Sequence, residues 1–306
     1  MGEYHNPVML RECIEGLNIK PNGVYVDVTF GGGGHSKAIL EELARVDSQT
    51  GRLIAFDQDD EAKANADLIE NRSFTFVQSN FRHLKKYLRL HGIKQVDGIL
   101  GDLGVSSHQI NEPGRGFSTR FDGPLDMRMN RSQKLTAREV INTYEQESLH
   151  RILGQYGEVR NAKTLASAIC QARIGTAITS IKQLLDVIKP FAPRGRENKY
   201  FAQVFQGIRI EVNEELKALE EMLEQSAELL KSDGRLVIMS YHSLEDRPVK
   251  NYINKGKFYG EVEKDFYGNE LKPFKAFNRK PIVASDQEIN QNNRARSAKL
   301  RVAIKI

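Results

Sequence analysis

The chain has 306 residues, of which 40% are hydrophobic and 28% are charged, and its mean hydropathy is -0.50. This composition is typical of globular proteins and excludes fibrous, disordered and disulfide-stapled classes. No run of about 18 uncharged apolar residues occurs, and the first residues lack the basic and apolar regions of a signal peptide, so we expect a cytoplasmic protein without a membrane span. Two cysteines without C-x-x-C or zinc spacing indicate neither a disulfide framework nor a metal site.

The net charge of +5 is unevenly distributed along the chain. Residues 251–306 hold 12 Lys and Arg against 6 Asp and Glu, which gives +6, so residues 1–250 sum to -1. Concentrated positive charge suits phosphate-bearing partners, because each contact releases condensed counterions. A basic surface that faces only solvent explains the charge as well.

Strand-like and helix-like stretches alternate over the first hundred residues, which predicts βαβ units around a parallel sheet. The predicted strands are 24–28, 52–56, 74–77 and 95–100, and the predicted helices are 36–46, 62–71 and 81–91. The alternation resumes near the end of the chain with an amphipathic stretch at 211–231, a turn at 232–234, a strand at 235–239 and an antiparallel strand at 298–306.

The intervening residues contain helical patterns and no convincing strand. A capping box at Thr136–Glu139 opens one helix, and further helices are predicted at 149–153, 162–172 and 181–188. We therefore predict an α/β protein with a mostly parallel sheet formed by residues 1–106 and 199–306, and an inserted helical domain at 107–198.

The most informative feature is a strand that ends in several glycines and then opens a helix. Asp27–Ser36 is DVTFGGGGHS, and such a turn lets a ligand approach backbone amides at a helix N-terminus. It is not a P-loop, because Gly-Lys-Ser/Thr is absent, and the dinucleotide fingerprint lacks its third glycine. A ligand with a ribose but no essential pyrophosphate suits these features, and S-adenosylmethionine is the obvious candidate.

Carboxylates end two of the predicted strands. Asp57 ends the second strand, 24 residues after Gly33, where doubly wound domains bind ribose hydroxyls. Asp102 ends the fourth strand, at the crevice where a side chain can face both cofactor and substrate. The structural alternatives are a solvated carboxylate at Asp57 and a turn or helix cap at Asp102.

A hydroxyl, an imidazole and two carboxylates follow the fifth predicted strand in the segment SYHSLED, residues 240–246. No G-x-S-x-G elbow precedes the segment, so we expect Tyr241 and His242 to line a substrate pocket and not to belong to a nucleophilic triad. The histidines show no metal-ligand spacing, and we expect no metal.

Several long segments resemble, in the same order, the bacterial small-subunit ribosomal RNA cytosine-N(4) methyltransferases of the MraW family. The segments are HNPVML, DVTFGGGGHS, FDQD, DLGVSSHQ, RGFS, DGPLDMRM, VFQGIRIEVNEEL, MSYHSLEDRPVK and NRARSAKLR. The resemblance implies a Rossmann-like class I methyltransferase fold with an inserted substrate-recognition domain. It also implies S-adenosyl-L-methionine as cofactor and N(4)-methylation of a cytidine in the decoding region of 16S ribosomal RNA, within the small subunit.

Carried over residue by residue, the resemblance implies a set of cofactor contacts. These are Gly33, Gly34, His35, Asp57, Phe81, Asp102 and Gln109. Phe81 and Gln109 come from the resemblance alone, since an isolated Phe at a helix start more often packs in a core.

Asp102 is the candidate catalytic residue, because it or a nearby backbone carbonyl can accept a hydrogen from the substrate amine. Many DNA amino-methyltransferases carry Asp/Asn/Ser-Pro-Pro-aromatic where this chain has Asp102-Leu-Gly-Val105. The ring that stacks on the base must then come from elsewhere, and Phe117, Phe121 and Tyr241 are candidates.

Basic residues in two stretches are candidates to hold RNA. Arg294, Arg296 and Lys299 precede the last strand, and Arg115, Arg120, Arg128 and Arg131 lie near the start of the helical insertion. Their alternative role is solvated surface charge.

Three other functions stay open at this point. A methyltransferase acting on a small molecule or protein would need no basic tail, and a non-catalytic RNA-binding assembly factor would need no cofactor pocket. An NAD-dependent oxidoreductase is disfavoured by the missing third glycine. The sequence does not distinguish a monomer from a homodimer, and it identifies no general base.

Overall fold

The structure, a computed structural model, describes residues 7–45 and 50–306. Two residues of the HNPVML segment, His5 and Asn6, and the end of the predicted helix 36–46 lie outside these ranges. The chain divides into two compact units, one comprising Met1–Gly104 and Leu216–Ile306 and the other Val105–Glu215.

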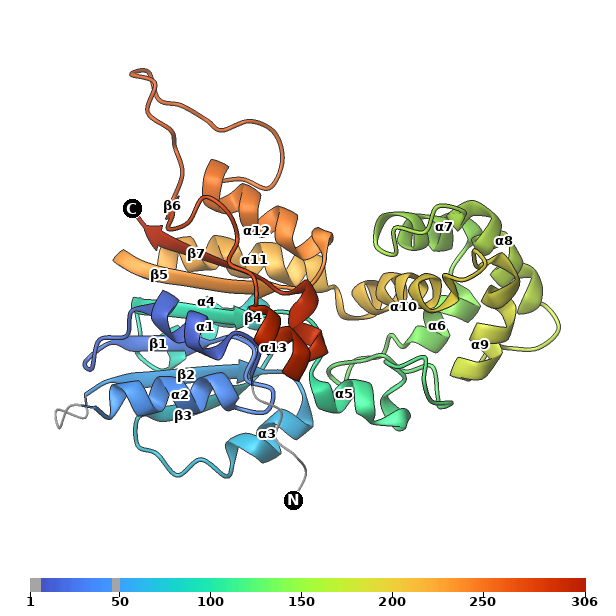
Figure 1. The fold of residues 1–306 in the computed structure, drawn as a ribbon, viewed down its shortest axis with the longest axis horizontal. Coiled ribbons are helices and arrows are strands. Elements are labelled where there is room, and N and C mark those ends of the chain that lie inside the picture. The colour runs from blue at the N-terminus through green and yellow to red at the C-terminus, as the bar shows by residue number, and fades with distance from the viewer. Residues whose placement is uncertain (1–6, 46–49) are drawn as a thin grey trace. The chain divides into compact units, whose positions relative to one another are not determined.

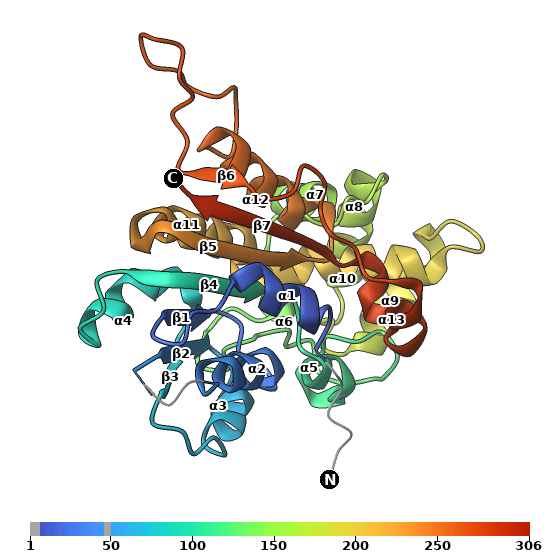
Figure 2. The same cartoon turned by 60° about the vertical axis from the view of Figure 1, so that its left-hand side comes forward.

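The first unit contains a seven-stranded sheet with the order β3-β2-β1-β4-β5-β7-β6 (Figure 2). The strands are β1 (Val24–Asp27), β2 (Arg52–Asp57), β3 (Phe74–Gln78), β4 (Val96–Asp102), β5 (Leu230–Ser240), β6 (Phe274–Ala276) and β7 (Lys299–Lys305). Strands β1 to β5 pair in parallel, whereas β7 is antiparallel to both β5 and β6. The predicted α/β class with a mostly parallel sheet is confirmed.

Helices cover both faces of this sheet because alternate strand residues point to opposite sides. Val26 and Ile54 pack with α4 (Leu84–Leu90), α11 (Glu215–Leu229) and α12 (Ser243–Lys255) in one buried cluster. Tyr25 and Leu53 pack on the other side with α1 (Leu10–Leu17), α2 (Gly34–Leu43) and the segment around α13 (Asp286–Gln291). Figure 1 shows α1, α2 and α13 in front of the strands. Helix α3 (Asp60–Ala66) packs on a smaller cluster with Phe30.

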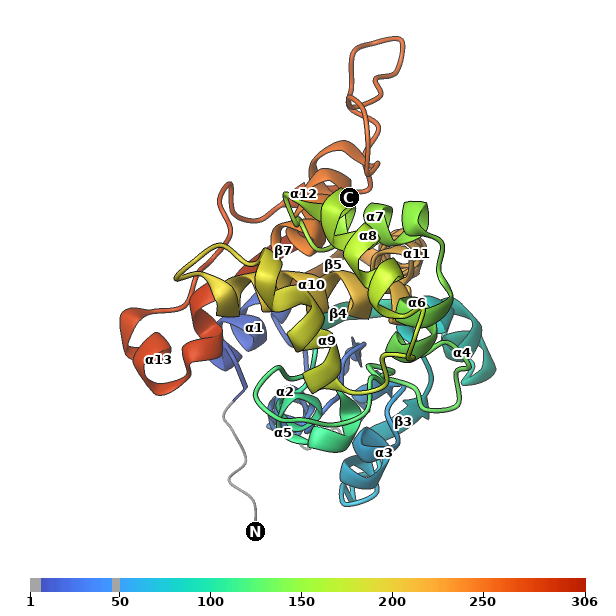
Figure 3. The same cartoon turned by 90° about the vertical axis from the view of Figure 1, so that its right-hand side faces the viewer.

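The second unit is helical (Figure 3), and it has a buried hydrophobic core of its own. Its helices are α5 (Ser107–Asn111), α6 (Ala137–Thr143), α7 (Gln146–Gln155), α8 (Ala162–Ala172), α9 (Ile181–Ile188) and α10 (Glu197–Asn213). The predicted insertion ended at residue 198, whereas this unit ends at Glu215. The difference arises because Val204, Ile208 and Val212 of α10 are buried in the helical core.

Three further expectations about the elements differ from the structure. The stretch 211–231 is not one helix, because Glu214 has a φ of 49° and separates α10 from α11. The expected turn at 232–234 lies inside β5, where Asp233 has a φ of 64° and the pairing of β4 with β5 shifts register. Strand β6, most of helix α10, and helices α1, α5, α12 and α13 were not predicted.

Between α12 and β6 the chain makes a long excursion, drawn in orange in Figure 1. A bridge between Lys264 and Glu270 closes its outer part, and Phe266 at the tip is 97% exposed. Over the ranges that the structure describes, no helix is both long enough and apolar enough to span a membrane.

Candidate active site

Three aspartates end three neighbouring parallel strands of the first unit. Asp57 ends β2, Asp27 ends β1 and Asp102 ends β4, and these strands are adjacent in the order β2-β1-β4. The carboxyl edge of an open parallel sheet is where such folds bind ligands. The topology therefore gathers three carboxylates at the edge where a ligand is expected.

Asp27 is the most buried of the three and joins β1 to the first turn of α2. Its Oδ1 accepts the Thr29 N–H at 3.0 Å, and its Oδ2 accepts the Ser36 hydroxyl at 2.7 Å. Burial raises the pKa of this carboxyl, while His35, Ser36 and Thr29 oppose the rise. Asp27 was not among the predicted site residues. A carboxylate within the apolar strand VYVDV was the available signal, because buried charges need dedicated partners.

The glycine turn is shaped by close contacts. Gly33 has a φ of 77°, and a Cβ there would lie 2.7 Å from the Phe30 ring. A Cβ on Gly34 would lie 2.3 Å from Cγ of Pro7. His35 is buried, with Nε2 3.2 Å from the Val8 carbonyl oxygen. The N-terminal segment thus packs on the turn. A larger residue at Gly34 would displace that segment, and one at Gly33 would displace the Phe30 ring.

Asp57 is held by backbone donors at the end of β2. Its Oδ2 accepts the Gly31 N–H at 2.8 Å and its Oδ1 accepts the Asp59 N–H at 3.0 Å. Burial raises the pKa of this carboxyl to about 6, and the two backbone hydrogen bonds oppose the rise. The backbone of Gln58 also donates to this carboxylate, and the acceptor capacity that remains fits a ligand hydroxyl.

Asp102 faces a phenol. Its Oδ1 accepts the Tyr241 hydroxyl at 2.7 Å, and its own N–H donates to Thr29 Oγ1 at 2.6 Å. Burial raises the pKa of the Asp102 carboxyl to about 6, while His35 and Tyr241 oppose the rise. Burial and the Asp102 charge together raise the pKa of the Tyr241 hydroxyl. At neutral pH Tyr241 is therefore the donor and Asp102 the ionised acceptor.

Glu245, the third residue of α12, fixes the position of Tyr241. The buried Glu245 carboxylate accepts the Tyr241 N–H at 3.0 Å through Oε2, and its Oε1 lies 3.2 Å from His242 Nε2. The structure thus brings Tyr241 to Asp102, whereas His242 lies beside Glu245, with both ring nitrogens buried and without a hydrogen-bond partner among the described residues. The sequence analysis had not assigned Glu245 a role.

The two contacts inferred only from the resemblance have local roles. Phe81 begins a 3-10 turn, Phe81–His83, and packs partly buried against the sheet core. Gln109 belongs to the helical unit, where its Oε1 accepts the Ser106 N–H at 3.0 Å and closes the capping box of α5. Cofactor contact at both residues stays a prediction.

Several basic residues proposed to hold RNA are engaged within the protein. Arg115 is buried and donates to the carbonyl oxygens of Arg128 and Met129 at 3.0 and 3.2 Å, so its prediction as a surface contact is wrong. Arg128 is paired with Asp126 at 2.7 Å. Lys299 Nζ lies 3.7 Å from Asp246 Oδ2. The sequence could not reveal these internal partners.

Other predicted RNA-contacting residues stay accessible. Arg120, Arg131 and Arg296 are exposed, and Arg294 is half-buried. Arg296 and Arg294 lie on the 3-10 segment Asn293–Ser297, directly before β7. Within the described ranges no group of three or more His, Cys, Asp or Glu side chains is arranged to hold a metal ion.

Comparison with known proteins decides the family. The model of the MraW methylase family matches residues 2–306. The chain belongs to the MraW methylase family. The resemblance noted in the sequence is thereby confirmed, and members of this methylase family use S-adenosyl-L-methionine as methyl donor.

Similar proteins cover almost the whole chain. A protein of Cytophaga hutchinsonii named ribosomal RNA small subunit methyltransferase H is 59% identical over 300 residues, 98% of this chain and 99% of its own. A protein of the same name from Christiangramia forsetii is 57% identical over 304 residues, 99% of this chain and 98% of its own. A Streptococcus mutans structure with SAH aligns at a TM-score of 0.43 and 12% identity, covering 99% of this chain and 100% of that one.

The residues at the carboxyl edge fit the cofactor of this family. Asp57 has acceptor capacity left for a ribose hydroxyl. The glycine turn leads directly into α2, whose N-terminus favours the negative charge of a carboxylate. The Asp57 carboxylate and the glycine turn both lie within the first unit.

Proposed function

We propose that this protein methylates the exocyclic N(4) amine of a cytidine in the decoding region of 16S ribosomal RNA, acting on the small ribosomal subunit. The observation that carries the proposal is the near end-to-end identity of 59% with a small-subunit ribosomal RNA methyltransferase. The carboxyl edge of the sheet supports it with one carboxylate for a ribose and a second one for an amine.

In this proposal Asp57 binds the ribose of the cofactor, and Gly33, Gly34 and His35 shape the turn that receives the rest of it. Phe81 and Gln109 are further proposed contacts. Bound S-adenosylmethionine supplies a methyl group on a positively charged sulfur, which is already activated for transfer. The protein therefore needs to position the acceptor and exclude water more than it needs a strong base.

Asp102 acts on the acceptor. The amine lone pair of cytosine is delocalised into the ring, and a carboxylate that accepts an amine hydrogen returns electron density to the nitrogen. Tyr241 occupies Oδ1 of Asp102, which leaves Oδ2 for the amine. When nitrogen gains the methyl group it must lose a proton, and Asp102, with a pKa of about 6, accepts it.

The helical unit and the segment before β7 are the proposed RNA-binding parts. Arg294 and Arg296 offer charge on the first unit, and Arg120 and Arg131 offer it on the helical unit. His242, which follows Tyr241 in the chain, is also proposed to contact the substrate. A base in structured RNA must leave its stack to reach the site.

The proposal is tested by transfer of labelled methyl from S-adenosylmethionine to small ribosomal subunits isolated from cells lacking this protein, followed by nucleoside analysis. Free ribosomal RNA and bulk protein serve as parallel acceptors. We expect a single N(4)-methylcytidine in 16S RNA. Label in protein would support a methyltransferase with another acceptor, and binding of subunits without transfer would support an assembly factor.

A further inference from the structure

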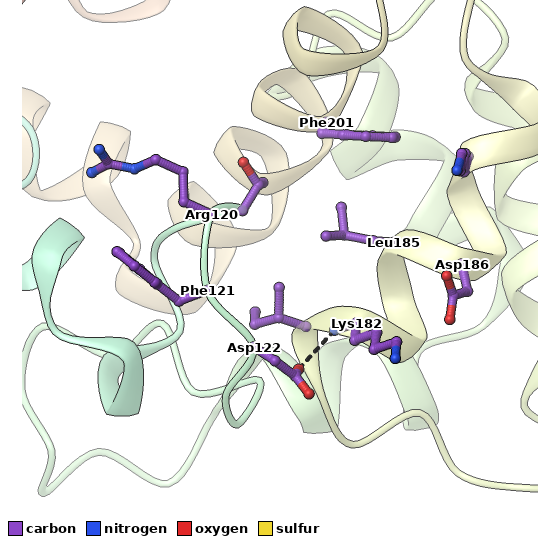
Figure 4. A pocket seen from close by; sticks show the side chains of 10 residues that line it. Arg120, Phe121, Asp122, Lys182, Leu185, Asp186 and Phe201 are labelled. Atoms are coloured by element: carbon purple, nitrogen blue, oxygen red, sulfur yellow. Dashed lines mark hydrogen bonds between the residues drawn. The ribbon is translucent and has the colours of Figure 1, made fainter.

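The helical unit carries a shallow pocket of about 370 Å³ outside the candidate active site (Figure 4). It lies among the loop 119–122, helix α9 and the beginning of α10. Figure 4 shows Phe121 on one side of the pocket, with Phe201 and Leu185 across from it. Phe121 is 42% exposed, so one of the two rings is readily accessible to a ligand.

More cations than carboxylates line this aromatic pocket. Arg120, Lys182 and Lys189 line it, together with two carboxylates, Asp122 and Asp186. The Asp122 carboxylate is hydrogen-bonded to backbone, because its Oδ1 accepts the Lys182 N–H at 3.0 Å and the Gly123 N–H at 2.9 Å. The backbone N–H of Lys182 lowers the pKa of this carboxyl.

Arg120 makes its side-chain contacts with neutral groups. Its side chain donates to the neutral oxygens of Asn111 and Ser118, and its guanidinium lies 5.6 Å from the centre of the Phe121 ring. By contrast, Arg128, Arg151 and Arg209 all pair with carboxylates within 3.0 Å. The Arg120 charge therefore has no carboxylate partner at the pocket.

Aromatic rings beside cations are the usual means of binding unpaired nucleotides. The ring faces stack on a base without regard to its identity, while Arg and Lys contact the adjoining phosphates. We propose that this pocket binds one unpaired nucleotide of the RNA substrate, with its base against Phe121 and Phe201 and its phosphates near Arg120, Lys182 and Lys189. This inference rests on the proposed function, and it adds an RNA subsite within the helical unit.

Binding is measured with the full chain and a fluorescein-labelled single-stranded RNA of about 12 nucleotides, by fluorescence anisotropy. Phe121→Ala should weaken binding about 5- to 150-fold, because a stacking partner is lost. Phe201 also packs on the helical core, so Phe201→Leu is used, which keeps an apolar side chain but removes the flat ring. Melting temperatures verify that each variant is folded.

Two matched controls separate the pocket from general effects. Phe266→Ala removes an exposed ring of the first unit and should leave the affinity unchanged. The double variant Lys182→Gln, Lys189→Gln should lower the slope of log affinity against log salt concentration by about 1 to 2. Lys163→Gln, at an exposed position of α8, should leave that slope unchanged.

Wild-type affinity and salt dependence in the folded Phe121, Phe201 and double-lysine variants would overturn the subsite. If those variants bind RNA normally while the wild type methylates small subunits, the subsite fails and the proposed function stands. If the wild type transfers no methyl group but the variants lose RNA binding, the subsite stands and the proposed function fails.

Discussion

Asp57 allows a direct test of the cofactor site. Asp57→Ala should weaken S-adenosylmethionine binding by roughly 1–3 kcal/mol, because ribose hydroxyls would lose their acceptor in a partly buried site. Isothermal titration calorimetry measures the change. The matched control is Asp60→Ala, three residues further on, where an exposed carboxylate accepts the Gln78 amide. Equal affinities of the two variants would remove Asp57 from the site.

Asp102 should make methyl transfer sensitive to acid. Its pKa of about 6 means that the carboxyl becomes protonated below that pH and can no longer accept the amine hydrogen or proton. We expect kcat/KM to fall with decreasing pH around 6. Asp102→Asn should lower kcat about 10²-fold or more and abolish that limb. If Asp102→Asn keeps both the wild-type rate and the fall in rate at low pH, another group causes the pH dependence.

The same substitution should stabilise the fold. The folded-state pKa of Asp102 is raised from 3.8 to about 6, so ionisation opposes folding above pH 6 and this penalty disappears as the pH falls below the unfolded-state value. Asp102→Asn should raise the free energy of unfolding at neutral pH by up to roughly 3 kcal/mol. Denaturant unfolding should show the gain shrinking toward pH 4, and a gain independent of pH would contradict this origin.

Residue roles could be read from the sequence only where a pattern fixes the position in the fold. Asp57 and Asp102 were predictable because each ends an apolar run at a strand terminus. The pairing of Tyr241 with Asp102 was not, since 139 residues separate them and only the pairing of β4 with β5 brings the strand ends together. The prediction that Arg115 contacts RNA failed for the same reason, because the sequence does not mark the backbone carbonyls that accept its hydrogen bonds.

At the level of elements, the capping box of α6 should contribute measurably to the helical unit. Thr136 Oγ1 accepts the Glu139 N–H at 3.3 Å, and the Glu139 carboxylate accepts the Thr136 N–H at 2.8 Å. Thr136→Ala should destabilise the unit by about 1 kcal/mol. Thr143→Ala, in the last turn of the same helix, is the control, and thermal unfolding of both variants measures the difference.

Most regular elements were predictable because their apolar period is clear, and the exceptions have physical causes. Strand β6 has three residues, Phe274–Ala276, too few to show a period of two. Helix α1 buries Cys13 and Leu17 four residues apart, which is the signal that could have revealed it. The break at Glu214 requires a left-handed backbone at a non-glycine residue, and no sequence rule marks it.

The molecule as a whole should unfold in two steps. The buried clusters of the sheet unit contain no residue from 105–215, and the core of the helical unit lies entirely within 125–212. Differential scanning calorimetry should resolve two transitions, and S-adenosylhomocysteine should raise chiefly the one that belongs to the sheet unit, which supplies all of its proposed contacts except Gln109. Thr136→Ala should lower the other. Equal shifts of both transitions would mean that the units unfold together.

The strand order constrains how the protein can be made. Strand β6 pairs with β7 and with no other strand of the sheet, and β7 also supplies the antiparallel neighbour of β5. During translation, residues 230–276 therefore emerge before the segment that must separate β5 from β6. Until residues 299–305 leave the ribosome, β5 exposes an open edge and the sheet unit stays incomplete. The nascent chain must accordingly avoid premature pairing of β5, and folding of this unit finishes only after almost all of it has been synthesised.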